Sequence, residues 1–384
     1  MQHLIKDTKT ILAELVAFPT VSGSATTEIE EFIAMRIGAA AAERIEAARS
    51  GVEQRNLLFR FGPDAPGAIV LSGHTDVVPV ADQAWSHPPF EMVETAGRLY
   101  GRGTCDMKGF LACMLAILPI LATAPLKRPI WFAFTCDEEP GCLGLPDLLK
   151  VLGARSIAVE AVIVGEPSSM DVIDRHKGAF VETVTFHGVS AHSSVPWLGV
   201  SANEYATRFL GALLDRKERY KASAPQGNLN DAITLNLAQI SGGTAHNIVA
   251  DRCEVMWSLR CPAHVDPGPV VEDLRALYPE LERSMQAEHP HAQVRWNTDF
   301  DVPPLAPDES SPAVALGLHL TGRNAARSVN YGTEAGLYQS AGYPTIVCGP
   351  GSIEQAHKPD EFIEIAQLEE CLTFFQRLID HQCR

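Results

Sequence analysis

Three short apolar runs, each followed at once by polar or glycine-rich residues, constrain the fold of this chain most strongly. They are residues 68–72, 130–135 and 161–164, and segments with helical spacing of apolar residues separate them. Continuous apolar runs of this length are typical of strands buried on both faces, as in a parallel sheet covered by helices. The first part of the chain therefore predicts an α/β domain with a largely parallel sheet between helices.

The pattern changes after about residue 177. The elements expected there are, in order, a strand, a helix, two strands, a helix and a strand, at residues 181–186, 203–219, 234–240, 254–260, about 269–285 and about 292–299. This β-α-β-β-α-β order is typical of a small antiparallel sheet with two helices on one face. We therefore expect an α+β domain inserted into the first one.

The first pattern resumes after the break at Pro303-Pro304, with a helix near 311–321, a strand at 345–347 and a final helix. The sequence thus predicts one discontinuous α/β domain, made of residues 1–177 and 303–384, with an insertion at 178–302. At the N-terminus, Asp7 is expected to cap the first helix.

Composition excludes several classes of function. Lys and Arg total 31 and Asp and Glu 47, a net charge of −16, which repels phosphate backbones and anionic lipids, so no nucleic-acid or membrane partner is expected. The longest near-apolar run, 110–124, is shorter than the ~18 residues of a membrane span, and Pro119 interrupts it. Lys6, Asp7 and Lys9 break any apolar signal-peptide core. The nine cysteines include no Cys-x-x-Cys pair, which favours buried free thiols in the cytoplasm.

Side chains that can bind metals follow the apolar runs. In chain order they are His74 and Asp76, Asp106 before a helix expected near Met107, Glu138 and Glu139, Glu166, and His357. The carboxyl ends of parallel strands meet at one edge of a sheet, and imidazoles with carboxylates suit Zn, Co or Mn. Each residue alone has an ordinary alternative: a structural hydrogen bond for His-x-Asp, a solvated face for paired Glu, a helix cap for Asp106. Converging carboxylates repel one another, however, so a bound metal explains the whole set best.

Five segments resemble, in the same order, the motifs of the co-catalytic zinc amidohydrolases and exopeptidases. They are GHTD at 73–76, GRGTCDMKG at 101–109, DEE at 137–139, GEPS at 165–168 and QAHKPD at 355–360. The resemblance spans nearly the whole chain. It implies a zinc-peptidase α/β domain with an inserted lid or dimerisation domain, and the hydrolysis of a linear amide.

The resemblance also implies two divalent ions, zinc in the first place and cobalt as the alternative. His74 and Glu166 would hold one ion, Glu139 and His357 the other, and Asp106 would bridge them. A shared carboxylate offsets the repulsion between two dications at about 3.5–4 Å.

Other residues receive roles by the same resemblance. Asp76 would accept the second imidazole N–H of His74, and Glu138 would be the general base that moves a proton from water to the leaving amine. In the insertion, His192 lies in a segment similar to the family's lid, where it would bind the oxyanion in the partner subunit's site. This implies a homodimer.

The substrate would be a small N-acyl amino acid. Asn247 and Arg260 resemble the lid's substrate-binding residues, although Arg260 at a strand end is almost equally suited to a surface ion pair. Segments 175–178, 329–335 and 349–357 most resemble the branch that removes the acetyl group from N2-acetyl-L-ornithine, in arginine biosynthesis. Glu334 would then pair with the substrate's side-chain ammonium, with a structural carboxylate as the alternative. Hydrolysis of N-succinyl-diaminopimelate or another N-acyl amino acid is the alternative activity.

Three other classes are disfavoured. A serine hydrolase would need a Gly-x-Ser-x-Gly elbow, and a nucleotide-binding protein a Gly-x-Gly-x-x-Gly or Gly-Lys phosphate loop; the sequence contains none of these. A non-enzymatic metal-binding relative would be expected to lose Glu138, Asp106 or a histidine ligand, and all are present.

Overall fold

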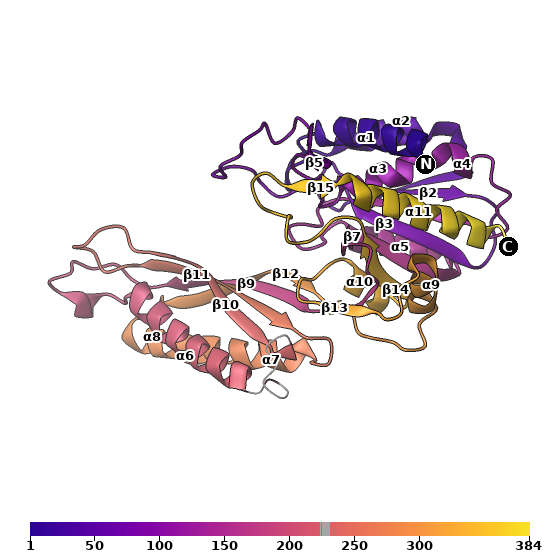
Figure 1. The fold of residues 1–384 in the computed structure, drawn as a ribbon. Helices are drawn as coiled ribbons and strands as arrows, with labels where there is room; N and C mark the ends of the chain where they lie inside the picture. The colour runs from indigo at the N-terminus through magenta and orange to yellow at the C-terminus, as the bar shows by residue number, and fades with distance from the viewer. Residues whose placement is uncertain (223, 225–230) are drawn as a thin grey trace. The chain divides into compact units, whose positions relative to one another are not determined.

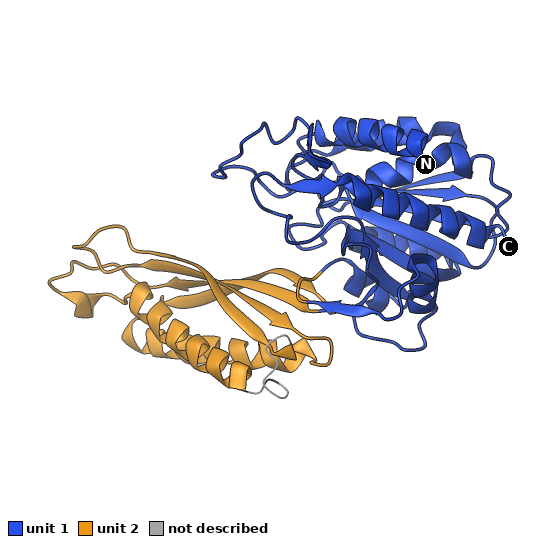
Figure 2. Cartoon of the chain, in the orientation of Figure 1, with its two compact units in different colours: residues 1–176, 305–329, 333–384 blue, residues 177–304, 330–332 orange. Residues whose placement is uncertain are grey.

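The chain folds into two compact units, each with its own hydrophobic core (Figure 2). The structure, a computed structural model, describes residues 1–222, 224 and 231–384. Unit 1, which is described in full, comprises Met1–His176, Leu305–Val329 and Thr333–Arg384. Unit 2 comprises Lys177–Pro304 and Asn330–Gly332.

Unit 1, all of it described, is built on an eight-stranded sheet. Its strands are β1 Glu43–Ala48, β2 Arg55–Phe61, β3 Ala68–His74, β6 Ile130–Thr135, β7 Val159–Pro167, β8 Ile173–His176, β13 Arg327–Val329 and β14 Thr345–Gly349. They lie in the order β1-β2-β6-β3-β7-β14-β8-β13, and the four central strands β6, β3, β7 and β14 are parallel. The predicted α/β class with a mixed, largely parallel sheet is confirmed.

Helices cover both faces of this sheet (Figure 1). The helices of unit 1 are α1 Gln2–Val16, α2 Thr27–Ile37, η1 Gly38–Ala40, α3 Lys108–Ala116, α4 Leu118–Leu121, α5 Leu145–Arg155, α9 Pro312–Thr321, α10 Ala335–Ser340 and α11 Ile365–Gln382. Ile69 and Leu71 pack with α1, α3 and α11, whereas Val70 packs with α5 and α10 on the other face. Because successive side chains of β3 point to opposite faces, burial on both faces requires the unbroken apolar run seen in the sequence.

A smaller sheet in unit 1 has the order β15-β5-β4. Its strands are β4 Val93–Thr95, β5 Arg98–Tyr100 and β15 Phe362–Glu364. It joins the segment before α3 to a segment near the end of the chain, since Tyr100 pairs with Phe362.

Unit 2 has, over its described residues, a four-stranded antiparallel sheet in the order β10-β11-β9-β12. Its elements are β9 Gly178–His187, η2 Pro196–Leu198, α6 Ala202–Ala222, β10 Thr234–Gly242, β11 Arg252–Cys261, α7 Pro267–Arg275, α8 Leu277–Glu288 and β12 Gln293–Val302. The second expected helix is two helices, α7 and α8. Pro279 explains the break, because it lacks an N–H and its ring crowds the carbonyl group of Arg275 four residues earlier.

The first helix begins earlier than the sequence predicted. Helix α1 begins at Gln2, so Asp7 lies inside it and the prediction that Asp7 caps the helix is wrong. Leu4 and Ile5 pack against the core of unit 1, and this burial accounts for the additional turn.

The cysteines agree with the expectation of free thiols. All nine cysteines lie among the described residues; they are free thiols, and eight of them are buried. No helix in the described part of the chain combines the length and apolarity that crossing a bilayer requires.

Candidate metal centre

The residues named as metal ligands lie at the carboxyl edge of the central strands. His74 is the last residue of β3, Glu166 is the second-last residue of β7, and Glu139 lies in the loop that follows β6. These three strands are parallel neighbours, so their carboxyl ends meet at one edge of the sheet. Asp106 lies just before α3, and His357 lies between β14 and β15. The N-cap of α3 is Met107, so Asp106 does not occupy the capping position that the alternative requires.

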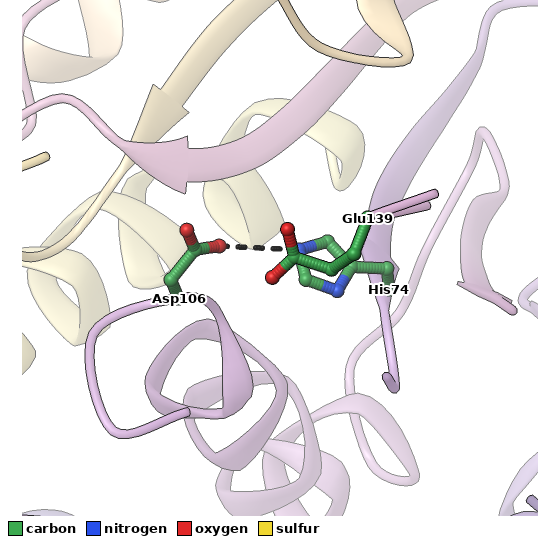
Figure 3. Close-up of side chains that lie close together, drawn as sticks. All are labelled: His74, Asp106 and Glu139. Atoms are coloured by element: carbon green, nitrogen blue, oxygen red, sulfur yellow. Dashed lines mark hydrogen bonds and ion pairs between the residues drawn. The ribbon is translucent and has the colours of Figure 1, made fainter. Parts of the chain in front are cut away.

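The five side chains converge, with Asp106 between the two histidines. Its Oδ1 lies 3.1 Å from Nε2 of His74, and its Oδ2 lies 3.2 Å from Nε2 of His357. Oε1 of Glu166 is 3.4 Å from the same His74 nitrogen, and Oε2 of Glu139 is 3.1 Å from the His357 nitrogen. Figure 3 shows the Asp106 carboxylate directed at His74, with Glu139 beside them. One carboxylate thus faces two His–carboxylate pairs, which is the arrangement a bridging ligand needs.

The donor set fits divalent cations. His74, Asp106 and Glu139 place ligand atoms within 4.8 Å of one another, and so do His74, Glu138 and Glu166. All are nitrogen or oxygen donors of the kind that zinc and cobalt accept. Oε1 of Glu139 is buried and is one of the few such atoms in the described chain without a hydrogen-bond partner. An unpaired buried carboxylate oxygen is costly, and a cation would satisfy it.

Burial and neighbouring charges shift the pKa values of the acids at this site. Burial, and after it the charge of Asp106, raises the pKa of Glu166 to about 8. Burial and the charge of Glu166 raise the pKa of Glu138 well above its usual range. For Asp106, burial alone would raise the pKa, but the hydrogen bonds from His357 and His74 outweigh it and lower the pKa. The hydrogen bonds that His357 donates to Asp106 and Glu139 raise its own pKa to about 11. The raised pKa values of Glu138 and Glu166 show that their charged forms are disfavoured without a cation, and metal ions would displace protons on binding.

Asp76 contacts His74 through a different atom from the one expected. Nδ1 of His74 donates to the backbone carbonyl of Asp76 at 2.9 Å, whereas the Asp76 carboxylate is 3.7 Å away. That carboxylate instead accepts the backbone N–H groups of Glu138 at 3.0 Å and Glu139 at 3.2 Å. Asp76 thereby ties the end of β3 to the loop after β6.

A second acid shapes that loop. Asp137 has a positive φ of 49°, unusual for a residue other than glycine. Its side chain is ion-paired with Arg49 and accepts from Nε2 of Gln54 at 3.1 Å and from the N–H of Gly23 at 3.4 Å. Sequence reasoning missed these partners, because they lie in no motif.

Glu138, the expected general base, is partly exposed and close to His74 and Glu166. Sγ of Cys142 donates to its Oε1 at 3.3 Å. The geometry leaves Glu138 able to face a substrate, and its role as a base stays a prediction.

Glu334 is buried beneath this edge of the sheet, with 1% exposure. Its oxygens accept from Oγ of Ser72 at 2.5 Å and Oγ1 of Thr135 at 2.9 Å, at the ends of β3 and β6. Its partners Ser72 and Thr135 lie within a few residues of His74 and Glu139 in the sequence, and both oxygens of the carboxylate are already hydrogen-bonded. Its role in substrate binding stays a prediction.

The predicted lid residues lie in unit 2, at two ends of its sheet. His192 and Asn247 are exposed on neighbouring loops that pair through His192 and Ile248. Nδ1 of His192 is 2.7 Å from Oγ of Ser194. Arg260 pairs with Ala179 at the start of β9, the far end of that strand from these loops. The eight residue steps of β9 from Ala179 to His187 span about 26 Å at ~3.3 Å per residue. The structure therefore brings His192 and Asn247 together and leaves Arg260 apart from them.

Two further charged residues beside the centre were not assigned a role by sequence reasoning. Arg102 and Glu361 are both 1% exposed and form an ion pair of 2.7 Å. Arg102 lies inside the motif at 101–109, and Glu361 directly follows the motif at 355–360. Their position next to predicted ligands in the sequence was the signal that could have found them.

Comparison with known proteins agrees with this geometry. The model of peptidase family M20/M25/M40 matches residues 70–381. An acetylornithine deacetylase of Erwinia tasmaniensis is 34% identical over 332 residues, which cover 85% of this chain and 83% of the relative. An acetylornithine deacetylase of Proteus mirabilis is 36% identical over 333 residues, covering 85% and 82%.

Solved structures share the fold at low identity. A tripeptidase from Staphylococcus aureus has a TM-score of 0.76 at 21% identity, covering 99% of both chains. An M20 metallo-carboxypeptidase from Sulfolobus solfataricus has a TM-score of 0.77 at 16% identity, covering 98% and 99%. A dinuclear metal-binding M20 peptidase from Bacillus subtilis has a TM-score of 0.63 at 14% identity, covering 99% and 98%. The resemblance inferred from the motifs is confirmed: the chain belongs to peptidase family M20/M25/M40.

Proposed function

We propose that the protein removes the acetyl group from N2-acetyl-L-ornithine, giving L-ornithine and acetate, as a step of arginine biosynthesis. Its family makes it a metal-dependent hydrolase of amide bonds. The observation that carries the proposal is the meeting of two imidazoles and three carboxylates at the strand ends. Relatives of 34–36% identity named acetylornithine deacetylase support this substrate.

The cofactors would be two divalent ions, zinc or alternatively cobalt. His74 and Glu166 would hold one, Glu139 and His357 the other, and Asp106 both. When bound, the ions acidify a water molecule and polarise the amide carbonyl.

Glu138 would carry the proton. It accepts one from the attacking water and delivers it to the departing amine. Burial and the neighbouring Glu166 raise its pKa, which makes it a stronger base than an exposed carboxylate. Asp76 holds the backbone of Glu138 and so directs this side chain.

The active form would be a homodimer. His192 and Arg260 lie at opposite ends of one sheet, so a single unit 2 presents only one of them to a given substrate. This separation supports a site in which His192 and Asn247 come from the partner, as the lid motif implies. Arg260 would then act in the site of its own chain, where a guanidinium suits the substrate carboxylate. The free buried thiols support a cytoplasmic location.

The substrate assignment is tested by turnover of N-acetylornithine, other N-acetylamino acids and N-succinyl-diaminopimelate, with zinc and with cobalt. We expect the highest kcat/KM for N-acetylornithine. Glu334→Gln should raise KM for this substrate more than for N-acetylamino acids without a side-chain ammonium. Clear preference for the succinyl substrate would instead identify a desuccinylase, and no hydrolysis with either metal would leave a metal-binding protein.

The dimer is tested by mixing two inactive variants, His192→Ala and Glu138→Ala, under conditions of subunit exchange. In a mixed dimer one of the two sites holds an intact Glu138 and a partner's intact His192. Equal amounts exchanged at random make half of the dimers mixed, so activity should return to about a quarter of wild type. Mixtures that exchange subunits and stay inactive would contradict a shared site.

A further inference from the structure

The buried ion pair between Arg102 and Glu361 links two segments that carry metal ligands. Nη1 of Arg102 is 2.7 Å from Oε2 of Glu361, and both residues are 1% exposed. The second oxygen of Glu361, Oε1, accepts the backbone N–H groups of Cys105 at 2.9 Å and Asp106 at 3.0 Å. Glu361 therefore fixes the main chain at the ligand that faces both histidines.

Arg102 makes the other half of this connection. Its Nη1 donates to the carbonyl oxygen of Lys358 at 3.4 Å, and its Nη2 donates to Oε1 of Gln83 at 2.6 Å. Nε2 of Gln83 in turn donates to the carbonyl oxygen of His357 at 3.0 Å. Arg102, Gln83 and Glu361 thus hold the main chain on both sides of the pair formed by Asp106 and His357.

The two halves of the centre differ in how they are supported. His74 and Glu166 stand on β3 and β7, which pair with each other and with further strands on both sides. His357 stands in a loop, its backbone has a positive φ of 63°, and its side chain is 53% exposed. The half on the strands needs no additional support, whereas the half with His357 depends on the contacts that hold its loop.

We propose that Arg102, Gln83 and Glu361 form a positioning unit for the metal position of Glu139 and His357. Through Asp106 the unit also touches the other position, but it affects the affinity of the His357 position far more. The proposal rests on the ligand assignment of the proposed function. It assigns no contact with substrate to these residues.

The test is a zinc titration of the metal-free protein by calorimetry, with bound metal counted after dialysis. Glu361→Gln keeps the size of the side chain but cannot accept from Arg102 and from both N–H groups at once. We expect the second equivalent to bind about 10–100-fold more weakly, as for other groups that orient ligands. The first equivalent shares Asp106 and should weaken by no more than a few-fold. At saturating zinc, kcat should recover.

Gln83→Ala keeps the test decisive if Glu361→Gln does not fold. Gln83 is partly exposed, and its loss removes the contact to the His357 backbone but leaves the buried pair intact. We expect a weakening of the second equivalent only, by several-fold.

The matched control is Glu30→Gln. Glu30 is also a buried carboxylate of unit 1 that accepts from an arginine and from a backbone N–H, both of Arg55, at 2.9 and 3.0 Å. Neither Arg55 nor Thr26, its other hydrogen-bond partner, lies in a ligand segment. This variant should bind both equivalents as wild type does. Equal weakening of both equivalents in Glu361→Gln and Gln83→Ala, or no weakening in either, would overturn the proposal. Wild-type protein that binds no second equivalent would refute the dinuclear centre itself.

Discussion

The carboxylates of Asp76, Glu138 and Glu139 lie close together, but their oxygens have different hydrogen-bond partners. These partners indicate a different role for each residue. Both oxygens of Asp76 accept backbone N–H groups of the loop after β6. This side chain therefore has a structural task and is not available to bind a metal. Oε1 of Glu139 is buried without a hydrogen-bond partner among the described residues, which leaves it available to a cation. Among the described residues, only the weak Sγ–H of Cys142 donates to the side chain of Glu138, which is partly exposed. It is therefore the acid best placed to exchange a proton with substrate.

Glu138→Gln should lower kcat by about 10²–10⁴-fold, the range for loss of a positioned general base, while KM changes little. Metal content should stay at two ions per chain, because Glu138 is not among the predicted ligands. The measurements are steady-state kinetics and elemental analysis of the same sample. Cys142→Ala is the control: it removes the contact to Oε1 of Glu138 and should keep kcat within about tenfold. Near-normal turnover of Glu138→Gln at full metal content would show that another group is the base.

Sequence patterns predicted best the strands that are buried on both faces. The three apolar runs became β3, β6 and β7 within three residues at either end, because strands buried on both faces need continuous apolar sequence. The helix ends were harder, since packing of Leu4 and Ile5 moved the start of α1 and Pro279 divided the last helices of unit 2. Motifs indicated the predicted ligands but not the residues that contact the ligand-bearing segments. Arg49, Gln54 and Gln83 lie far from their partners in sequence, so only the folded chain shows those contacts.

The close approach of β7 and β14 gives a prediction for one element. A Cβ at Gly349 would collide with the carbonyl group of Gly165, a backbone atom that cannot turn away. Gly349→Ala should therefore push β14 from β7, destabilise unit 1 by about 3 kcal/mol or more, and displace Glu166. Chemical denaturation and zinc titration measure the two effects. Gly153→Ala in α5 is the control, because a Cβ there meets no atom within 4 Å, and it should stabilise by about 0.5–1 kcal/mol. Equal stability of the two variants would contradict the close contact.

In the whole chain, the two units carry different sets of predicted functional residues. The predicted metal ligands all belong to unit 1, and the predicted lid residues His192, Asn247 and Arg260 all belong to unit 2. Each unit has a separate core, so each has its own source of stability. A ligand that binds only the folded form of one unit stabilises that unit and leaves the other unchanged, unless the two unfold together.

Removal of metal should therefore destabilise unit 1 selectively. An ion present at 100 times its dissociation constant contributes about 2.7 kcal/mol to the folded state, and a domain of this size shifts by about 2–4 °C per kcal/mol. Treatment with a chelator should lower the calorimetric transition of unit 1 by about 5–10 °C per ion lost. Hydrogen exchange read by mass spectrometry assigns the effect: protection should fall in β3 and β7, where His74 and Glu166 stand, and persist in β9 and β11. Zinc added back should restore it, whereas magnesium, which prefers oxygen ligands, should not. An equal loss of protection in β9 and β11 would mean that the units unfold as one, and unchanged protection in β3 would place the metals elsewhere.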